Sequence, residues 1–195
     1  MSSIKQLVQE NQKEELIKAL SEGADVNQKD KSVNTIQTAL HFSCYKSNID
    51  ILKTLLEHRY INVNLEDKTG WSAIHVACNF GAYKSVLEML KDPRVDVNIV
   101  DPIGWSALIC ASYSGEAEVV KLLISFGRNV DVEIKTTFED SGTGTKKGCT
   151  ALDIARQRNK TNVVSVLEQY QLNPLETRNT LRKQLELEGK ERWIL

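Results

Sequence analysis

Apolar residues recur along this chain at the three- and four-residue spacing of short amphipathic helices, and polar turns separate these helices into pairs. The first pair is expected within residues 3–29. Its apolar edges consist of Ile4, Leu7, Val8, Leu16, Ile17 and Leu20. The segment Ile49–Glu57 continues the pattern as a longer helix with its own buried edge. The pattern predicts an all-α fold made of helix pairs.

The helix pairs are copies of one unit. The most regular copy, Asp67–Asn98, opens on Asp-x-x-Gly, continues as Trp-Ser-Ala-Ile-His, breaks at Gly81 and closes on Val-Asp-Val-Asn. The same order returns in Asp101–Val132, with Trp71 and Trp105 separated by 34 residues. A fixed period of this size predicts a solenoid in which each unit packs only on its neighbours.

The repeated residues resemble the ankyrin repeat, whose pattern is a turn, TPLH, a short helix, Gly, a longer helix and GADVN. The chain carries TALH, SAIH, SALI and TALD in register, and GADVN stands at Gly23–Asn27. The resemblance covers roughly residues 1–171. It implies an all-α ankyrin-repeat solenoid of about five helix-turn-helix repeats with a C-terminal capping helix. The repeats are expected at about 1–29, 30–66, 67–100, 101–133 and 145–171.

Three stretches depart from the family pattern. The first unit lacks the TALH turn and reads as a capping repeat with one polar face. The second unit has the degenerate turn KSVNTIQ, which predicts an irregular loop. The fifth unit contains an insert at 133–147 that is either an elongated hairpin or a mobile loop. We favour the loop, because an isolated hairpin is marginally stable in water.

The last segment, 172–195, is expected to be a capping helix and a tail. Asn173-Pro174-Leu175-Glu176 has the residues of a helix start, with Asn as N-cap and Pro at the first position, and Gly189 can end the helix. We expect this helix to cover the apolar flank of the last repeat. The apolar end Trp193-Ile194-Leu195 either packs back on the solenoid, which we favour, or forms a docking tail.

Charge and composition mainly argue against certain classes of partner. The formal net charge is −1, from 25 basic and 26 acidic residues, which gives no electrostatic footprint for nucleic acid or for an anionic membrane. No apolar run reaches the length of a membrane-spanning helix, and the N-terminus lacks the features of a signal peptide. We therefore expect no nucleic acid and no membrane partner.

The cysteines and histidines have the positions of structural residues. Cys44, Cys78 and Cys110 are expected to be buried reduced thiols of a cytoplasmic or nuclear protein, because no C-x-x-C pair occurs. The resemblance implies that His41 and His75 tie neighbouring turns together. No zinc spacing, nucleotide-binding loop or nucleophile elbow is present. We expect no enzyme activity, no cofactor and no metal.

The resemblance implies a binding surface on the concave face, lined by turn residues and by the last positions of each inner helix. The predicted partner-binding residues are Tyr45, Lys68, Trp71, Asn79, Phe80, Ile103, Trp105, Tyr113, Lys146, Lys147 and Arg158. Five of these are aromatic in a chain with twelve aromatic residues, and aromatic side chains often anchor interfaces. We expect Trp71 and Trp105 to stand side by side above a row of the other three. The alternative is that both indoles pack structurally on neighbouring turns.

The basic residues of the fifth repeat suggest the chemistry of the partner. Lys146, Lys147 and Arg158 favour an extended segment with apolar anchors over repeats two to four and acidic residues near repeat five. The alternative is that a solvated loop happens to carry two lysines.

The predicted function is a non-catalytic scaffold or adaptor that binds one or more proteins, as a monomer, in the cytoplasm or nucleus. One alternative is a dedicated, chaperone-like regulatory or assembly subunit of an enzyme complex that uses both the groove and the terminal helix. Another is an enzyme whose site lies in the insert, with Glu133, Glu139 and Asp140 as its acids. A third is the ankyrin part of a longer protein, although Met1 and the two caps favour a complete chain. Resemblance also suggests Asn98 as a passive hydroxylation site.

Overall fold

The computed structural model describes residues 3–29, 37–126, 128–139 and 141–187. These ranges contain eleven helices and no strand. The helices are α1 (Ile4–Gln9), α2 (Lys13–Ser21), α3 (Ala39–Tyr45), α4 (Ile49–Glu57), α5 (Ala73–Asn79), α6 (Tyr83–Lys91), α7 (Ala107–Ser114), α8 (Ala117–Ser125), α9 (Ala151–Gln157), α10 (Thr161–Leu172) and α11 (Pro174–Gln184).

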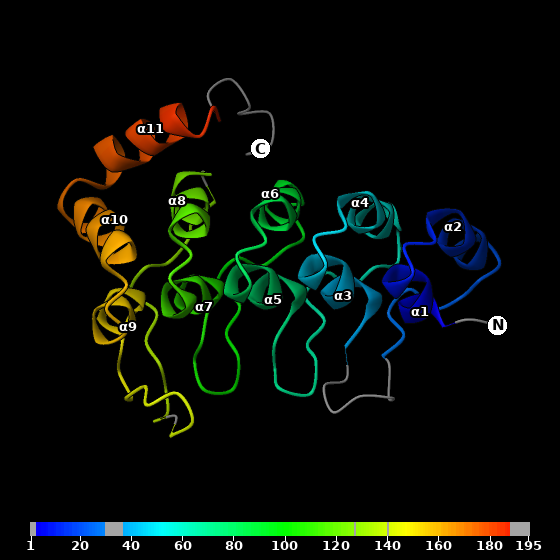
Figure 1. Ribbon diagram of the computed structural model, residues 1–195, viewed down its shortest axis with the longest axis horizontal. Coiled ribbons are helices and arrows are strands. Elements are labelled where there is room, and N and C mark those ends of the chain that lie inside the picture. The colour runs from blue at the N-terminus through cyan, green and yellow to red at the C-terminus, as the bar shows by residue number, and fades with distance from the viewer. Residues whose placement is uncertain (1–2, 30–36, 127, 140, 188–195) are drawn as a thin grey trace.

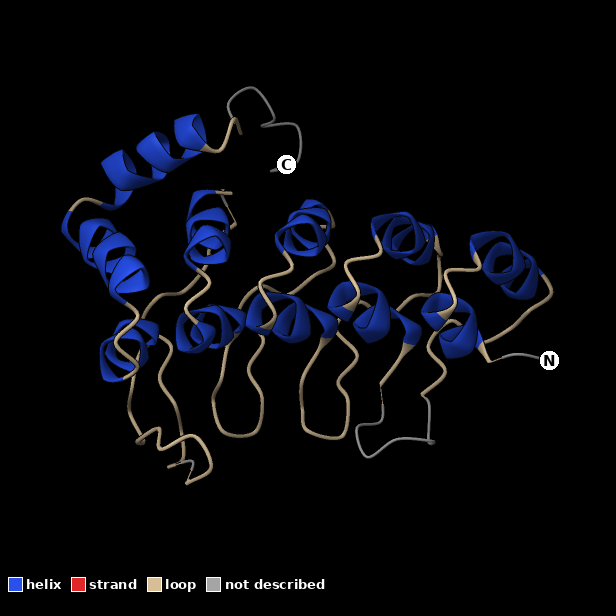
Figure 2. Cartoon of the chain, viewed as in Figure 1, coloured by secondary structure: helices blue, strands red, loops and turns tan. Residues whose placement is uncertain are grey.

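The first ten helices form five pairs that stack side by side in two layers (Figure 1). The inner layer contains α1, α3, α5, α7 and α9, each in contact with the next. The longer helices α2, α4, α6, α8 and α10 form the outer layer. The turns between successive units project from the inner layer on the side away from the outer helices (Figure 2). This arrangement confirms the predicted all-α solenoid.

The inner helices begin at the repeated motif because its residues satisfy the free backbone groups of a helix start. In α5, the backbone N–H of the N-cap Ser72 donates to Nδ1 of His75 at 3.1 Å, and the Ser72 hydroxyl completes a capping box. The other ring nitrogen of His75, Nε2, lies 3.0 Å from the carbonyl oxygen of Trp105 in the next turn. Because Nδ1 accepts, Nε2 carries the proton and donates to that oxygen. The bridge ties one repeat to the next.

The same bridge occurs one repeat earlier and is absent from the last two copies of the motif. His41 Nε2 lies 2.9 Å from the carbonyl oxygen of Trp71. In α7, Ile109 occupies the histidine position and offers no donor. In α9, Asp153 accepts from the backbone and hydroxyl of Thr150 and completes only the local cap. The two bridging histidines therefore hold the second, third and fourth turns together.

Neutral buried histidines make stability depend on pH. Burial lowers the pKa of His41 and His75 below 6.5, although hydrogen bonds to Trp71 and Trp105 oppose part of this shift. As the pH falls below about 6.5, the unfolded chain takes up protons on both rings while the folded chain does not. We therefore expect the free energy of unfolding to decrease as the pH falls through the window between 6.5 and the lowered pKa values.

Urea denaturation over a series of pH values, with NMR titration of the imidazole protons, measures this effect. In the double variant His41→Asn/His75→Asn, the free energy of unfolding should no longer decrease with pH in this window through these two residues. Imidazoles that titrate at or above 6.5 in the folded protein would contradict the prediction.

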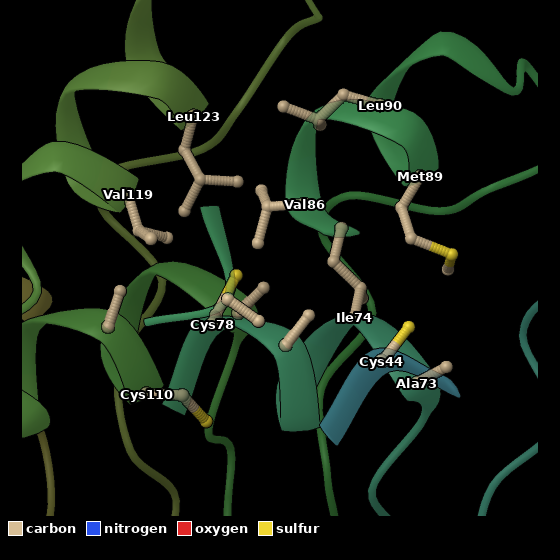
Figure 3. Close-up of a cluster of buried hydrophobic side chains, with 14 of the residues drawn as sticks. Cys44, Ala73, Ile74, Cys78, Val86, Met89, Leu90, Cys110, Val119 and Leu123 are labelled. Carbon is tan, nitrogen blue, oxygen red and sulfur yellow. The ribbon is translucent and has the colours of Figure 1, made fainter. Parts of the chain in front are cut away.

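The core between the layers is continuous from repeat to repeat. In the middle of the solenoid, Ile74, Val86 and Leu90 are fully buried, and the cysteine thiols lie among them (Figure 3). Burial raises the pKa of the Cys44 thiol to about 12 and raises those of Cys78 and Cys110 well above their usual value. All four cysteines are buried and free, as expected for three of them. Thiols held in this way are inert.

Arginines cap the outer helices from the following unit. The Arg94 guanidinium donates to the carbonyl oxygen of Leu56 at the end of α4. Arg128 donates to Leu90 O at 3.3 Å and to Asp92 O at 3.0 Å, at the end of α6. Leu56 and Leu90 lie in the last turns of α4 and α6, where carbonyl groups lack partners within the helix, so the guanidinium groups satisfy them.

The last helix, α11, supplies the same cap to α8. Arg178 Nε donates to Ile124 O at 3.2 Å, and Arg182 Nε donates to Ser125 O at 2.9 Å. The expected C-terminal helix forms and begins at Pro174. The Asn173 side chain makes no capping bond, however, and α11 already ends at Gln184. Instead of covering only the last repeat, α11 turns back across α8 (Figure 1).

The insert folds against the fourth turn. Within 128–139 and 141–147 no strand forms, so the insert is a loop and not a hairpin, but it is bonded to neighbouring backbone where a mobile loop was expected. The backbone N–H of Thr137 donates to Ile103 O at 2.9 Å, and that of Thr136 donates to Cys149 O at 3.0 Å. The side chains of Thr136 and Thr145 are buried. These bonds join the fourth and fifth repeats, where the histidine bridge is missing.

Two expectations concern residues outside the described ranges. Most of the degenerate turn of the second unit and the whole of Trp193-Ile194-Leu195 fall there.

Candidate functional site

An exposed aromatic pair stands at the ends of two neighbouring inner helices. Tyr45 is the last residue of α3, and Phe80 follows the last residue of α5. Their ring centroids are 4.8 Å apart with an interplanar angle of 76°. The exposed fractions are 45% for Tyr45 and 55% for Phe80. Two large rings that remain this exposed while touching each other form an apolar surface available to a partner.

Trp71 and Trp105 line the same groove, but Trp105 is buried, so the structural alternative describes it. Trp105 is only 3% exposed. Its ring packs on Tyr113 with the centroids 5.0 Å apart, and the insert lies against the adjacent residues Ile103 and Gly104. The indole N–H is buried without a hydrogen-bond partner within the described residues. Trp105 is a core residue rather than a projecting anchor.

Trp71 is half-buried and has both structural and surface contacts. Its indole Nε1 donates to Asp101 Oδ2 in the next turn at 3.1 Å, and its ring stacks on His75 with the centroids 6.3 Å apart. The structural alternative, in which the indole packs on the neighbouring turn, is therefore confirmed for Trp71. The partly exposed remainder of the ring faces a groove.

The groove lies between the third and fourth turns and has a volume of about 470 Å³. Its walls are mainly apolar. They consist of Gln37, Asp67, Thr69, Trp71, Val76, Phe80, Asp101, Pro102, Ile103, Trp105 and Thr143. Thr143 comes from the insert, which thereby forms part of one wall. The sequence did not point to Val76, Thr143, Asp67 or Asp101 as residues of this surface.

Hydrogen bonds within the turns occupy the two carboxylates of the groove. Asp67 Oδ1 accepts from the backbone N–H groups of Thr69 at 2.8 Å and Trp71 at 3.2 Å. Asp101 Oδ1 accepts from those of Ile103 at 3.0 Å and Trp105 at 2.8 Å. Both carboxylates are buried and belong to the turn framework.

Cations surround the groove. Arg158 lies over the ring of Tyr113, with its guanidinium carbon 4.4 Å from the centroid, and Lys46 lies over Tyr45 at 5.2 Å. Three further exposed lysines stand in the third turn and at the base of the insert, namely Lys68, Lys146 and Lys147. Within the described part of the chain, none of these five cations forms an ion pair.

Asn79 and Asn98 hold repeats together. Asn79 Oδ1 accepts from Ser114 Oγ at 3.0 Å, which links the ends of α5 and α7. Asn98 Nδ2 donates to Asn129 O at 2.7 Å, and its Oδ1 accepts from the backbone N–H of Asp131 at 2.9 Å. Asn79 was predicted as a contact residue and is half-buried. Hydroxylation of Asn98 stays a prediction.

The described residues offer no group of three His, Cys, Asp or Glu side chains that could hold a metal ion. In the insert, Glu133 and Glu139 are exposed, and Glu133 Oε1 accepts from Gln171 Nε2 at 3.4 Å. Asp140 lies outside the described residues. Among the helices that the structure describes, none is both long and apolar enough to cross a membrane.

Comparison of the chain with models of known protein families gives a match. A family model described as ankyrin repeats, in three copies, matches residues 4–101 and again residues 82–177. No curated protein matches the chain.

Proposed function

Because this chain belongs to the ankyrin repeat family, whose members generally mediate protein–protein interaction, we propose that it is a non-catalytic scaffold or adaptor that binds a protein partner through its concave face. The concave face is the surface that carries Tyr45, Phe80 and the groove between the third and fourth turns. We propose that it acts as a monomer in the cytoplasm or nucleus.

The observation that carries this proposal is the exposed contact between Tyr45 and Phe80 beside the groove. Tyr45 belongs to one repeat and Phe80 to the next, so a partner that covers both rings would bury aromatic surface presented by two rigid units. Side chains on a preformed scaffold lose little conformational entropy on binding. Aromatic residues in such positions often dominate the binding free energy of an interface.

A second candidate function is a dedicated regulatory or assembly subunit of an enzyme complex. It is favoured by a second apolar surface far along the chain, where Leu172 and Leu175 are 78% and 72% exposed at the junction of α10 and α11. A subunit of this kind would need both surfaces, whereas a general adaptor would need the concave face alone.

Affinity capture from native lysate, read by mass spectrometry, tests the proposal. We expect specific proteins to be retained by the wild type and lost from the Tyr45→Ala/Phe80→Ala variant, because that variant removes the exposed anchors without touching the core. The matched control is Ile17→Ala/Tyr60→Ala, which removes two side chains that are 47% and 63% exposed elsewhere. Retention of the same proteins by both variants would contradict the proposal. Loss from Leu172→Ala/Leu175→Ala as well would favour the assembly subunit.

A further inference from the structure

The groove between the third and fourth turns points to a particular kind of partner segment. We propose that it binds an extended acidic peptide segment whose single bulky apolar side chain enters the groove and whose Asp and Glu residues meet the surrounding cations. This inference rests on the proposed function and specifies the chemistry of the partner.

The walls of the groove select an apolar side chain. Trp71, Phe80 and Ile103 are lining residues with apolar side chains that are at least partly exposed. The polar groups in the lining are largely satisfied, since Asp101 Oδ2 accepts from Trp71 Nε1 while its other oxygen accepts from two backbone N–H groups. The unpartnered donor in this lining is the Trp105 indole N–H, which is buried. A charged side chain would therefore lose its hydration in the groove with little to replace it, whereas an apolar one loses nothing.

The cations lie close to the groove through identifiable neighbours. Lys68 directly precedes Thr69, which lines the groove. Lys46 lies over Tyr45, and Tyr45 touches the lining residue Phe80. Lys68 is therefore the sequence neighbour of a lining residue, and Lys46 is linked to the lining through the ring of Tyr45. Both are exposed and unpaired within the described residues.

The fifth repeat adds positive charge on the other side of the pocket. Arg158 lies over Tyr113, whose ring packs on the lining residue Trp105. Lys146 and Lys147 are exposed at the base of the insert that contributes Thr143 to the groove wall. A segment with acidic residues on both sides of its apolar anchor would therefore meet cations at both ends.

The exposed acids nearby do not neutralise this surface. Glu66 precedes the third turn and Glu139 lies in the insert, and both are exposed. Five exposed cations therefore stand against two exposed acids at this surface. The lining carboxylates of Asp67 and Asp101 are buried and accept hydrogen bonds within the turns. The half-buried Glu116 lies beside Gly81. Complementary charge of this kind accelerates association and selects the correct partner, more than it deepens affinity. In the proposed complex, the charges would therefore set the rate and the choice of partner, and the apolar anchor would supply the buried contact.

The insert gives the groove a wall that the other repeats of this chain do not have. The insert is bonded to the fourth turn from Thr137 N to Ile103 O, and its Thr143 forms part of the groove wall. An extended segment that crosses the third and fourth turns therefore has its register set by the apolar side chain that fits beside this wall.

Selection of random peptides displayed on phage against the full chain tests the inference. Enriched peptides should carry a net negative charge and one bulky apolar residue, and their binding should weaken as salt is raised. Enrichment of basic peptides, enrichment without an apolar residue, or no enrichment at all would overturn the inference.

Charge reversal measured on a selected peptide sharpens the test. In fluorescence anisotropy with the labelled peptide, Lys146→Glu/Lys147→Glu should raise the Kd by about tenfold or more. The control Lys84→Glu/Lys183→Glu makes the same change of net charge at exposed lysines of α6 and α11 and should change the Kd by less than about twofold. Equal effects of the two variants would overturn the inference.

The outcomes for the two proposals are separable. If the natural partner is lost from Tyr45→Ala/Phe80→Ala but is retained by Lys146→Glu/Lys147→Glu, and if the selected peptides are not acidic, the concave face is the binding site and the acidic chemistry is wrong. If neither variant loses the partner, both proposals fail.

Discussion

Replacement of Gly104 by alanine is expected to destabilise the protein by more than the about 1–2 kcal/mol that a left-handed backbone costs an ordinary residue. Gly104 has a φ of +83°, and an added Cβ would lie 2.8 Å from Thr137 N and 2.9 Å from Lys135 O. Those atoms belong to the backbone of the insert and cannot rotate away. The insert would have to leave the fourth turn, with loss of the bond from Thr137 N to Ile103 O.

Gly23→Ala is the matched control for this prediction. Gly23 has a φ of +94°, but nothing lies within 4 Å of the Cβ that alanine would add. Its cost is therefore the backbone strain alone, and the difference between the two variants measures the contact with the insert. Urea denaturation gives the free energy of unfolding of both variants. Hydrogen exchange should show a faster-exchanging backbone amide at Thr137 only in Gly104→Ala. Equal losses of stability in the two variants would contradict the described position of the insert.

The second large effect is expected from Arg128→Ala, which should lower the free energy of unfolding by about 2–3 kcal/mol. Besides the carbonyl oxygens of Leu90 and Asp92, the Arg128 guanidinium donates to Pro93 O at 3.4 Å and to Val95 O at 2.6 Å. Alanine would leave the carbonyl oxygens of the buried residues Leu90 and Val95 without this donor. Asp92 O, by contrast, keeps its bond from Val95 N at 3.2 Å, and Pro93 is exposed to water.

Arg156→Ala provides the comparison for Arg128→Ala. Arg156 forms one ion pair with Glu168 at 2.7 Å, and the two side chains are 53% and 45% exposed. Such a surface pair contributes about 0.5 kcal/mol or less. Urea denaturation followed by far-ultraviolet circular dichroism measures both variants. A loss for Arg128→Ala no larger than that for Arg156→Ala would show that the capping bonds do not stabilise α6.

The regular part of the fold could be predicted from the sequence because its determinants are local. The N-cap serine or threonine and the histidine three residues later recur at a fixed spacing and place the starts of α3 and α5 at the predicted motif. The same spacing predicts that Tyr45 and Phe80 lie late on their inner helices. Both rings are exposed, as a surface role requires.

The remaining features depend on contacts between residues far apart in the sequence. Trp71 and Trp105 occupy the same motif position, but only Trp105 is followed by a repeat whose insert covers the adjacent turn. Thr143 lies in that insert and has no counterpart in the other units. The direction of α11 depends on Arg178 and on its bond to Ile124 O, to which no repeat pattern points.

The most direct test of the concave face as the binding site is photo-crosslinking from one of its own positions. A benzophenone amino acid replaces Phe80 in the full chain, and a second protein carries it in place of Ile17, which is similarly exposed on α2. After irradiation in native lysate, we predict specific crosslinked proteins from the position of Phe80 and none of them from the position of Ile17. The same crosslinked proteins from both positions, or specific products from Ile17 alone, would contradict binding through the concave face.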